Sequence, residues 1–347
     1  MSANVGEGAR KLGEKLLADL EVEDLSSILT ALRELQVEKQ QSNENTPHIF
    51  FGIPDLDILI PHPTTPILEL VSPPAPHHPS GAGKTSLLYL IIAHAILPAS
   101  LSSCIPLGGQ NAATILFDPL HHFSIPRLAE VMLNFLVSKI RAAGKEIDET
   151  IKSEIKALVS SSLTHLHIFR PQSWNALLST LRSLPDYLFD HTRHKSMHRR
   201  IHSMLLDDID AFAWSIRHAN TTATASNSLA TASSLLTTSL HRLGTLLSCG
   251  VVLTSQSTTP TSFRPALPTS WPQEMAVTRL AVRRVEVLKF APAISVEEAE
   301  VERAQRWDVV QKGRFECWKV GMGVKDGEGF VFRSGEEGVE VESNEGK

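Results

Sequence analysis

The chain has 347 residues, of which 42% are hydrophobic and 20% charged, so it has room for one large α/β domain and a short extension. A net charge of −5 excludes a chain-wide basic field that could hold nucleic acid unaided, so any contact with DNA would need a local patch or a partner. Three scattered cysteines, Cys104, Cys249 and Cys317, argue against both a disulfide framework and a zinc site.

The N-terminal region is expected to form a small helical extension. Leucines recur at helical spacing between residues 9 and 38, where the helices would either pack on the core or bind a partner, and residues 38–47 are typical of a linker. No signal peptide follows Met1 and no apolar run is long enough to cross a bilayer, so we expect a soluble intracellular protein. The sequence divides into an extension with its linker (1–45), a core (46–334) and an acidic tail (335–347) that we expect to be disordered.

The most informative stretch begins with an apolar strand over Ile67–Ser72 and ends with an apolar helix over Leu87–Leu97. Between them lies a glycine loop: Ser80, Gly81, Ala82, Gly83, Lys84, Thr85 and Ser86. This order is typical of a P-loop, in which backbone N–H groups and the helix N-terminus face a polyphosphate. We therefore predict that residues 80–86 bind ATP, with Lys84 on the β- and γ-phosphates and the Thr85 hydroxyl on Mg²⁺. The flanking strand and helix disfavour the alternative, a chance Gly-Lys-Thr in a surface helix.

One position departs from the full P-loop pattern. The motif asks for glycine five residues before Gly83, and His78 occupies that position. Glycine turns tightly there without steric cost, whereas histidine is penalised at positive φ. Residues 73–79 are rich in proline and resemble an insertion between the strand and the loop.

Two strand–helix units follow. Strands are predicted over residues 112–118 and 163–169, and helices over 124–140, continuing as an exposed helix to 158, and over 173–184. Residues 190–200 form a basic, histidine-rich segment. His194, His198 and His202 have i, i+4 spacing that could bind a metal, but no carboxylate or cysteine completes a set, so we prefer a solvated loop.

A second motif, Ile201–Asp208, consists of apolar residues that end in acids about 120 residues after the P-loop. It is typical of a Walker B strand, whose Asp207 would hold the Mg²⁺ water shell opposite Thr85. A fourth buried strand is predicted over residues 249–254, followed by Ser255 and Gln256. In a parallel sheet Gln256 would face the nucleotide, where we expect it to sense the γ-phosphate.

The rest of the core contains weaker signals. Residues 221–238 are rich in Thr, Ala and Ser and predict a mobile loop that leads into a helix at about 235–247, and residues 257–272 predict a second loop. Residues 280–291, with Arg279, Arg283, Arg284 and Lys289 on one face, resemble an edge strand. Residues 315–320 and 329–332 could form a final hairpin.

Alternation of strands and helices around a P-loop predicts a parallel sheet with helices on both faces. In order, these motifs resemble the RecA-like core of recombinases, and most of all the eukaryotic recombinase paralogues. The likeness is carried by Gly81–Tyr89 with Ile96–Pro98, by Ile115–Asp118 with His122 and Phe123, by Leu205–Asp207 with Ala211–Trp214, and by Lys15–Glu21. It covers roughly residues 10–290.

The resemblance implies DNA repair by homologous recombination in the nucleus. It implies an adaptor that binds ATP and Mg²⁺, assembles with other paralogues, such as the one lettered D or a Shu-type complex, and assists the recombinase filament. Direct DNA binding is expected to be weak, because the loops at 221–238 and 257–272 contain only one basic residue, Arg264. At most a weak DNA-dependent ATPase is expected.

Hydrolysis is expected to be weak because Leu120 stands where active recombinases have a water-activating glutamate. Leucine accepts no proton, and a general base contributes typically ~10²–10⁴-fold. Two other hypotheses remain. An active P-loop NTPase such as a small-molecule kinase would need a lid with catalytic arginines, for which only residues 193–200 qualify. A scaffold with an inactive nucleotide site would retain the P-loop helix for its core residues alone.

Overall fold

The computed structural model describes residues 49–61, 65–74, 82–101, 105–219, 225–259, 263–272, 275–285, 295–300, 303, 313–321, 328–336 and 338–342. The chain divides into two compact units, Met1–His48 and Ile49–Lys347, and every described residue belongs to the second. The helices predicted for the N-terminal extension and most of the proline-rich insertion, including His78, therefore lie outside the described residues.

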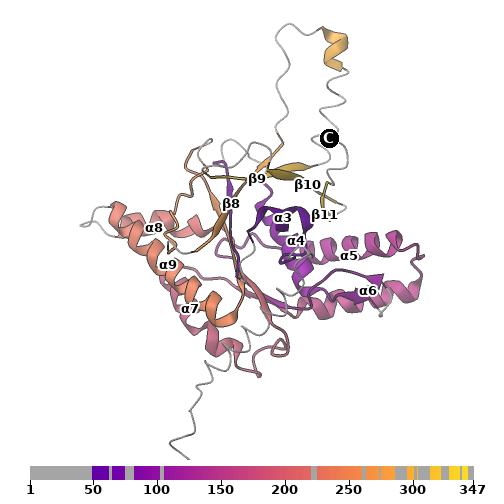
Figure 1. The fold of residues 1–347 in the computed structure, drawn as a ribbon, viewed down its shortest axis with the longest axis horizontal. Helices are drawn as coiled ribbons and strands as arrows, with labels where there is room; N and C mark the ends of the chain where they lie inside the picture. Colours follow the sequence, from indigo (N-terminus) through magenta and orange to yellow (C-terminus); the bar gives the residue numbers. More distant parts are fainter. Residues whose placement is uncertain are drawn as a thin grey trace, which may run out of the picture. The chain divides into compact units, whose positions relative to one another are not determined.

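Strands and helices alternate through most of the second unit (Figure 1). The strands are β1 (Ile67–Ser72), β2 (Ser100–Leu101), β3 (Ile105–Pro106), β4 (Ala113–Phe117), β5 (Leu166–Phe169), β6 (Ile201–Leu206), β7 (Gly250–Gln256), β8 (Val277–Arg284), β9 (Arg314–Lys319), β10 (Gly329–Gly335) and β11 (Gly338–Val341). The helices are α3 (Pro54–Leu59), α4 (Lys84–Ile96), α5 (Ile125–Ala142), α6 (Glu149–Leu163), α7 (Trp174–Leu188), α8 (Ala213–Ala219) and α9 (Ala225–Leu247), with a 3-10 turn η2 (Ile209–Phe212).

Nine strands form one sheet in the order β11-β10-β9-β8-β1-β7-β6-β4-β5. The six from β8 to β5 in this order are all parallel, and β9, β10 and β11 extend the sheet in antiparallel pairs. The predicted α/β class with a mostly parallel central sheet is confirmed. Among the described residues, no helix combines the length and apolarity needed to cross a membrane.

Helices cover both faces of the sheet, as predicted. Leu68 and Leu70 of β1 belong to a buried cluster with α3, α4 and α5, whereas Ile67 belongs to a cluster with α7, α8 and α9. Successive strand residues point to opposite faces, so a strand that is apolar throughout fits a sheet covered on both sides. Figure 1 shows the two groups of helices on opposite sides of the strands.

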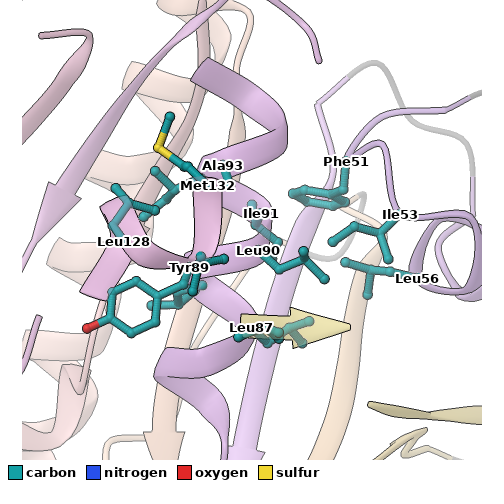
Figure 2. Close-up of a cluster of buried hydrophobic side chains, with 14 of the residues drawn as sticks. Phe51, Ile53, Leu56, Leu87, Tyr89, Leu90, Ile91, Ala93, Leu128 and Met132 are labelled. Carbon is teal, nitrogen blue, oxygen red and sulfur yellow. The ribbon is translucent and has the colours of Figure 1, made fainter. Parts of the chain in front are cut away.

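Helix α4 is buried almost all round. Figure 2 shows Leu90 and Ile91 of α4 toward Phe51, with Leu128 of α5 near Tyr89 on another side of the helix. Leu87 and Ile91 are fully buried. A helix packed between a sheet and two other helices needs apolar residues on every face, which explains its uniformly apolar sequence.

Four predictions about individual elements were wrong, at least in part. The loop predicted over 221–238 is helical from Ala225 onward, as part of α9. Leu229, Leu236 and Leu240 recur on its buried face, so small residues between them do not prevent packing. The predicted edge strand is β8, which lies inside the sheet between β1 and β9. Its partner β9 lies too far along the chain for the local pattern to reveal it.

The other two errors concern a helix break and the C-terminal tail. The helix expected to continue to 158 is interrupted between α5 and α6, where Gly144 has φ 71°, a left-handed conformation typical of glycine at helix ends. The tail expected to be disordered contains β11, which pairs with β10, and Glu342 forms ion pairs with Arg314 and Arg333. Residues 343–347 lie outside the described part.

Candidate functional site at the carboxyl edge of the sheet

The carboxyl ends of three neighbouring parallel strands bring the predicted site residues together. Ser72 ends β1 and is paired with Gln256, the last residue of β7, and β6 ends beside them at Leu206. Helix α4 begins at Lys84, after the loop that follows β1. In open α/β sheets, ligands bind at this edge, outside the carboxyl ends of the strands. The structure therefore brings both sequence motifs to the edge where ligand binding is expected.

Lys84 is only 7% exposed and is held by two polar partners. Its Nζ donates to Ser72 Oγ at 2.9 Å and lies 3.4 Å from Asp208 Oδ1. A buried lysine needs compensation for its lost hydration, and here a hydroxyl and a carboxylate provide it. Lys84 is also the first residue of α4, and a helix N-terminus favours an anion.

Thr85 and Asp207 are joined directly, although they lie 122 positions apart in the sequence. Thr85 Oγ1 donates to Asp207 Oδ2 at 3.1 Å, and Thr254 Oγ1 of β7 donates to Asp207 Oδ1 at 2.6 Å. The same Thr254 hydroxyl accepts from the N–H of Asp208 at 2.7 Å. Strand β7, which carries Thr254, lies next to β6 in the sheet. The Thr254 hydroxyl therefore holds both Asp207 and Asp208 in place.

The electrostatics of Asp207 suit a cation. Burial, and next the neighbouring Asp208 carboxylate, raise the pKa of Asp207 to about 6, against the opposing hydrogen bond from Thr254. A bound cation would lower that pKa, and Mg²⁺ prefers oxygen ligands such as those of Thr85 and Asp207. The described residues contain no group of three or more His, Cys, Asp or Glu side chains able to hold a metal alone. Mg²⁺ would take its other ligands from phosphate and water, as it commonly does.

Part of the predicted glycine loop falls outside the described residues, namely Ser80 and Gly81. Ala82 and Gly83 precede α4, and Gly83 has φ 89°, the left-handed conformation for which glycine is suited. The Ser86 side chain lies 3.0 Å, between hydroxyl oxygens, from Ser334 of β10. Hence the start of α4 contacts the antiparallel end of the sheet, a relationship that the sequence did not indicate.

Gln256 is exposed at the end of β7, and its backbone N–H donates to Asp210 Oδ2 at 2.5 Å. Asp210 Oδ1 also accepts from the N–H of Leu267 at 2.9 Å. Burial raises the pKa of Asp210 to about 6. This carboxylate therefore ties the loop predicted at 257–272 to the end of β6. The described residues of that loop form no helix or strand, as predicted.

A group of polar residues that is linked to Lys84 through Asp208 was not predicted as part of the site. Asp118, 1% exposed, follows β4 and accepts from the N–H groups of His122 and Phe123 at 2.9 and 3.4 Å. Its Oδ2 also lies 3.4 Å from Arg170 Nε. His122 Nδ1 lies 3.3 Å from Asp208 Oδ2. The signal available in the sequence was the pair of histidines just after a buried strand that ends in aspartate.

The histidines with i, i+4 spacing, weighed as a metal site in the sequence, do not lie on one helix. Residues 190–200 form turns, not a helix, so the i, i+4 spacing has no structural meaning there. His202 is fully buried in β6 and donates to Phe50 O at 2.9 Å, whereas His194 donates to Leu188 O. The preferred interpretation of residues 190–200, an exposed loop, agrees with the turns and the mostly exposed residues found there.

The segment 193–200, suggested as a catalytic lid, lies at the opposite edge of the sheet. Arg199 Nη1 donates to the carbonyl of Ile96, at the end of α4, and to that of Ala112, just before β4. Lys84 is the first residue of the same 13-residue helix, and at 1.5 Å per residue the two ends are roughly 18 Å apart. The arginines of this segment are therefore unsuited to contact a phosphate bound at Lys84.

No protein-family model matches the chain. Its function must therefore be inferred from the chemistry of the carboxyl-edge site and from the resemblance of its motifs.

Proposed function

We propose that the chain is an ATP-binding adaptor of the RecA-type recombinase paralogue class, acting in DNA repair by homologous recombination. Lys84 would contact the β- and γ-phosphates, Thr85 and Asp207 would hold Mg²⁺, and Gln256 would lie near the γ-phosphate. Within this class, the P-loop helix resembles that of the second X-ray-repair cross-complementing protein. Its partners would be other recombinase paralogues in the nucleus, and its contact with DNA would be weak.

The observation that carries the nucleotide part of the proposal is the 3.1 Å contact between Thr85 and Asp207. Two motifs that were predicted independently, and that should share one Mg²⁺, meet at the carboxyl edge of a parallel sheet. Buried Lys84 lies next to them. A chance Gly-Lys-Thr in a surface helix would place the lysine in solvent. The repair role is supported by the motif resemblance alone.

Slow hydrolysis is part of the proposal. Leu120 lies in a turn after β4 and is 45% exposed, and it offers no group that could accept a proton. Lys84 also has to give up its contacts with Ser72 and Asp208 before it can contact phosphate. This exchange makes the free energy of nucleotide binding less favourable. Weak affinity and little turnover are therefore expected of the chain alone.

The scaffold hypothesis has one observation in its favour. Lys84 is satisfied internally by Ser72 and Asp208, so it could be retained for stability alone. The kinase hypothesis has no comparable support, because residues 193–200 lie at the other edge of the sheet.

A binding titration separates these hypotheses. A fluorescent ATP analogue with Mg²⁺ should bind the wild-type chain, and Lys84→Ala should weaken binding at least tenfold. Lys152→Ala, which removes an exposed lysine of α6, is the matched control and should bind as the wild type does. Equal binding by Lys84→Ala and wild type would favour the scaffold, and rapid turnover would contradict the adaptor.

The repair role needs a separate test in cells. Loss of the chain should sensitise cells to DNA cross-linking agents, and the wild-type chain should restore resistance. Purification of the tagged chain from nuclei should recover other recombinase paralogues. Normal resistance in cells that lack the chain would reject the recombination role while leaving nucleotide binding unaffected.

A further inference from the structure

One carboxylate connects the P-loop lysine to a histidine that has no part in the P-loop motif. Asp208 Oδ1 lies 3.4 Å from Lys84 Nζ, and Asp208 Oδ2 lies 3.3 Å from His122 Nδ1. The side chain of Asp208 is 16% exposed, whereas that of His122 is 59% exposed. The imidazole is therefore open to solvent and lies one carboxylate away from the lysine.

Backbone contacts hold both members of this pair in place. Asp208 has φ 53°, in the left-handed region, and its N–H donates to Thr254 Oγ1 at 2.7 Å. The N–H of His122 donates to the buried Asp118 at 2.9 Å. Non-glycine residues in this region cost energy and persist where their surroundings fix them, often at functional sites. The position of the imidazole is thus set by two strand ends, those of β4 and β6.

The chemistry of the pair is that of an oriented base. When Nδ1–H of an imidazole donates to a carboxylate, the lone pair lies on Nε2, and the carboxylate stabilises the imidazolium that forms. Among the described residues, no side chain or backbone group is bonded to Nε2 of His122. This nitrogen is therefore available to a water molecule.

We propose that His122 is the general base for hydrolysis of a nucleoside triphosphate bound at Lys84, and that Asp208 is its positioning residue. This assignment rests on the proposed function. The water oxygen forms a bond to the γ-phosphorus while its proton passes to Nε2 of His122. The bond from the γ-phosphorus to the β–γ bridging oxygen breaks, and its electron pair leaves on the diphosphate. The imidazolium then releases the proton to bulk water.

This base stands in for the carboxylate that Leu120 cannot supply, and it accounts for the slow turnover expected of the chain. Two acids hold His122: Asp208, which follows β6, contacts its ring, and Asp118, which follows β4, accepts its backbone N–H. Each acid is also linked to a cation, Asp208 to Lys84 and Asp118 to Arg170. A phosphate that captures Lys84 leaves the Asp208 carboxylate to His122, so we expect the imidazole to be oriented best when nucleotide is bound.

The decisive experiment compares His122→Ala with His121→Asn in the full chain. His121 is the matched control because it is the adjacent histidine and its ring contacts Gln172. Asparagine tolerates the left-handed φ of 58° at that position. Affinity for MgATP should stay within twofold of wild type in both variants. The affinity for ADP with aluminium fluoride and Mg²⁺, which imitates the transition state, should fall at least tenfold in His122→Ala alone, as should turnover.

The role of Asp208 is tested by a double-mutant cycle on turnover. Asp208→Asn should lower turnover in the wild-type chain but cause no further loss in a chain that already contains His122→Ala, because Asp208 acts through the imidazole. A purely structural role of Asp208 would lower turnover further in the His122→Ala chain. Unchanged affinity for the aluminium fluoride complex in His122→Ala would overturn the assignment, as would wild-type binding of MgATP without turnover. Failure of the wild type to bind MgATP would instead reject the proposed function and, with it, the base.

Discussion

Gly83 lies directly against the ring of Phe315. A Cβ built at Gly83 would be 2.6 Å from Cδ1 of Phe315 and 3.0 Å from Cζ of Phe332. These two rings stack with centroids 5.3 Å apart and an interplanar angle of 18°. The residue that precedes α4 is therefore packed against the C-terminal strands β9 and β10. The antiparallel end of the sheet supports the start of α4, although it contributes no motif to the candidate site.

Gly83→Ala should destabilise the fold and weaken nucleotide binding. The new methyl group meets a stacked pair of rings that cannot move easily, and alanine is strained at φ 89°. We expect a loss of about 2–4 kcal/mol in the free energy of unfolding, from left-handed strain and overpacking together.

Gly144→Ala is the control, because Gly144 has a similar φ of 71° but open space around it. It should cost only the backbone strain, about 1–2 kcal/mol. Urea unfolding followed by circular dichroism measures both variants. Equal losses would mean that the rings of Phe315 and Phe332 do not restrict Gly83.

Asp207→Asn should stabilise the nucleotide-free chain at pH 7 and abolish the effect of Mg²⁺ on nucleotide binding. Burial and the adjacent Asp208 raise the pKa of Asp207 to about 6, so the folded state binds its proton more tightly than the unfolded state. Its contribution to stability is therefore present at low pH and is lost as the pH rises from about 4 to 6. Asparagine can keep the contacts with Thr85 and Thr254 without the charge, and we expect a gain of about 2 kcal/mol at pH 7.

Asp57→Asn provides the opposite case. Asp57 is also buried, but both of its carboxylate oxygens accept backbone N–H groups, from Phe50, Phe51, Gly52 and Ile53. The amide nitrogen of asparagine cannot accept, so two donors lose their partner and about 1–3 kcal/mol is lost. Thermal unfolding of both variants at pH 7 tests the contrast. Destabilisation by Asp207→Asn would show that its charge is compensated without a cation.

Stability should fall as the pH decreases from about 6.5 to 4. Burial lowers the pKa of His94, His167 and His202 to about 4, so the unfolded chain binds these protons first and stability is complete only above the ordinary histidine pKa. Fully buried His202 alone accounts for up to about 3 kcal/mol. The raised pKa values of Asp57, Asp207 and Asp210 act in the opposite sense, but these acids are fewer than the four histidines with a lowered pKa, of which His165 is the fourth.

The free energy of unfolding measured at pH 7, 5.5 and 4.5 checks this slope. His94→Leu should flatten it, because His94 Nδ1 is buried without a hydrogen-bond partner and leucine has no proton to bind. A slope unchanged by this substitution, or stability that rises on acidification, would contradict the prediction.

The sequence predicted those elements whose signal is local. β1 was predicted at its observed bounds because an apolar run bounded by prolines has one reasonable interpretation. Lys84, Thr85 and Asp207 were predicted to meet because their motifs fix strand ends, and parallel strand ends share an edge. By contrast, β8 was misjudged because its neighbour β9 is encoded about 30 residues further along the chain. The role proposed for His122 depends on Asp208, which only the folded chain brings near.

The partner of Arg279, like that of β8, could not be read from the sequence. The sequence suggested a basic face, but Arg279 Nη2 and Nε donate to Glu69 Oε2 at 2.7 and 2.9 Å, and Glu69 Oε1 accepts from Trp271 at 2.7 Å. Glu69 lies in β1 and is 2% exposed.

Arg279→Ala would leave a buried carboxylate without its cation, so we expect a loss of about 3–5 kcal/mol in the free energy of unfolding. Arg193→Ala removes an exposed pair with Asp190 and should cost less than about 1 kcal/mol. In Glu69→Gln with Arg279→Ala the charge is gone, and stability should partly recover. A double variant no more stable than Arg279→Ala would show that packing of the arginine stem, and not the buried charge, links β1 to β8.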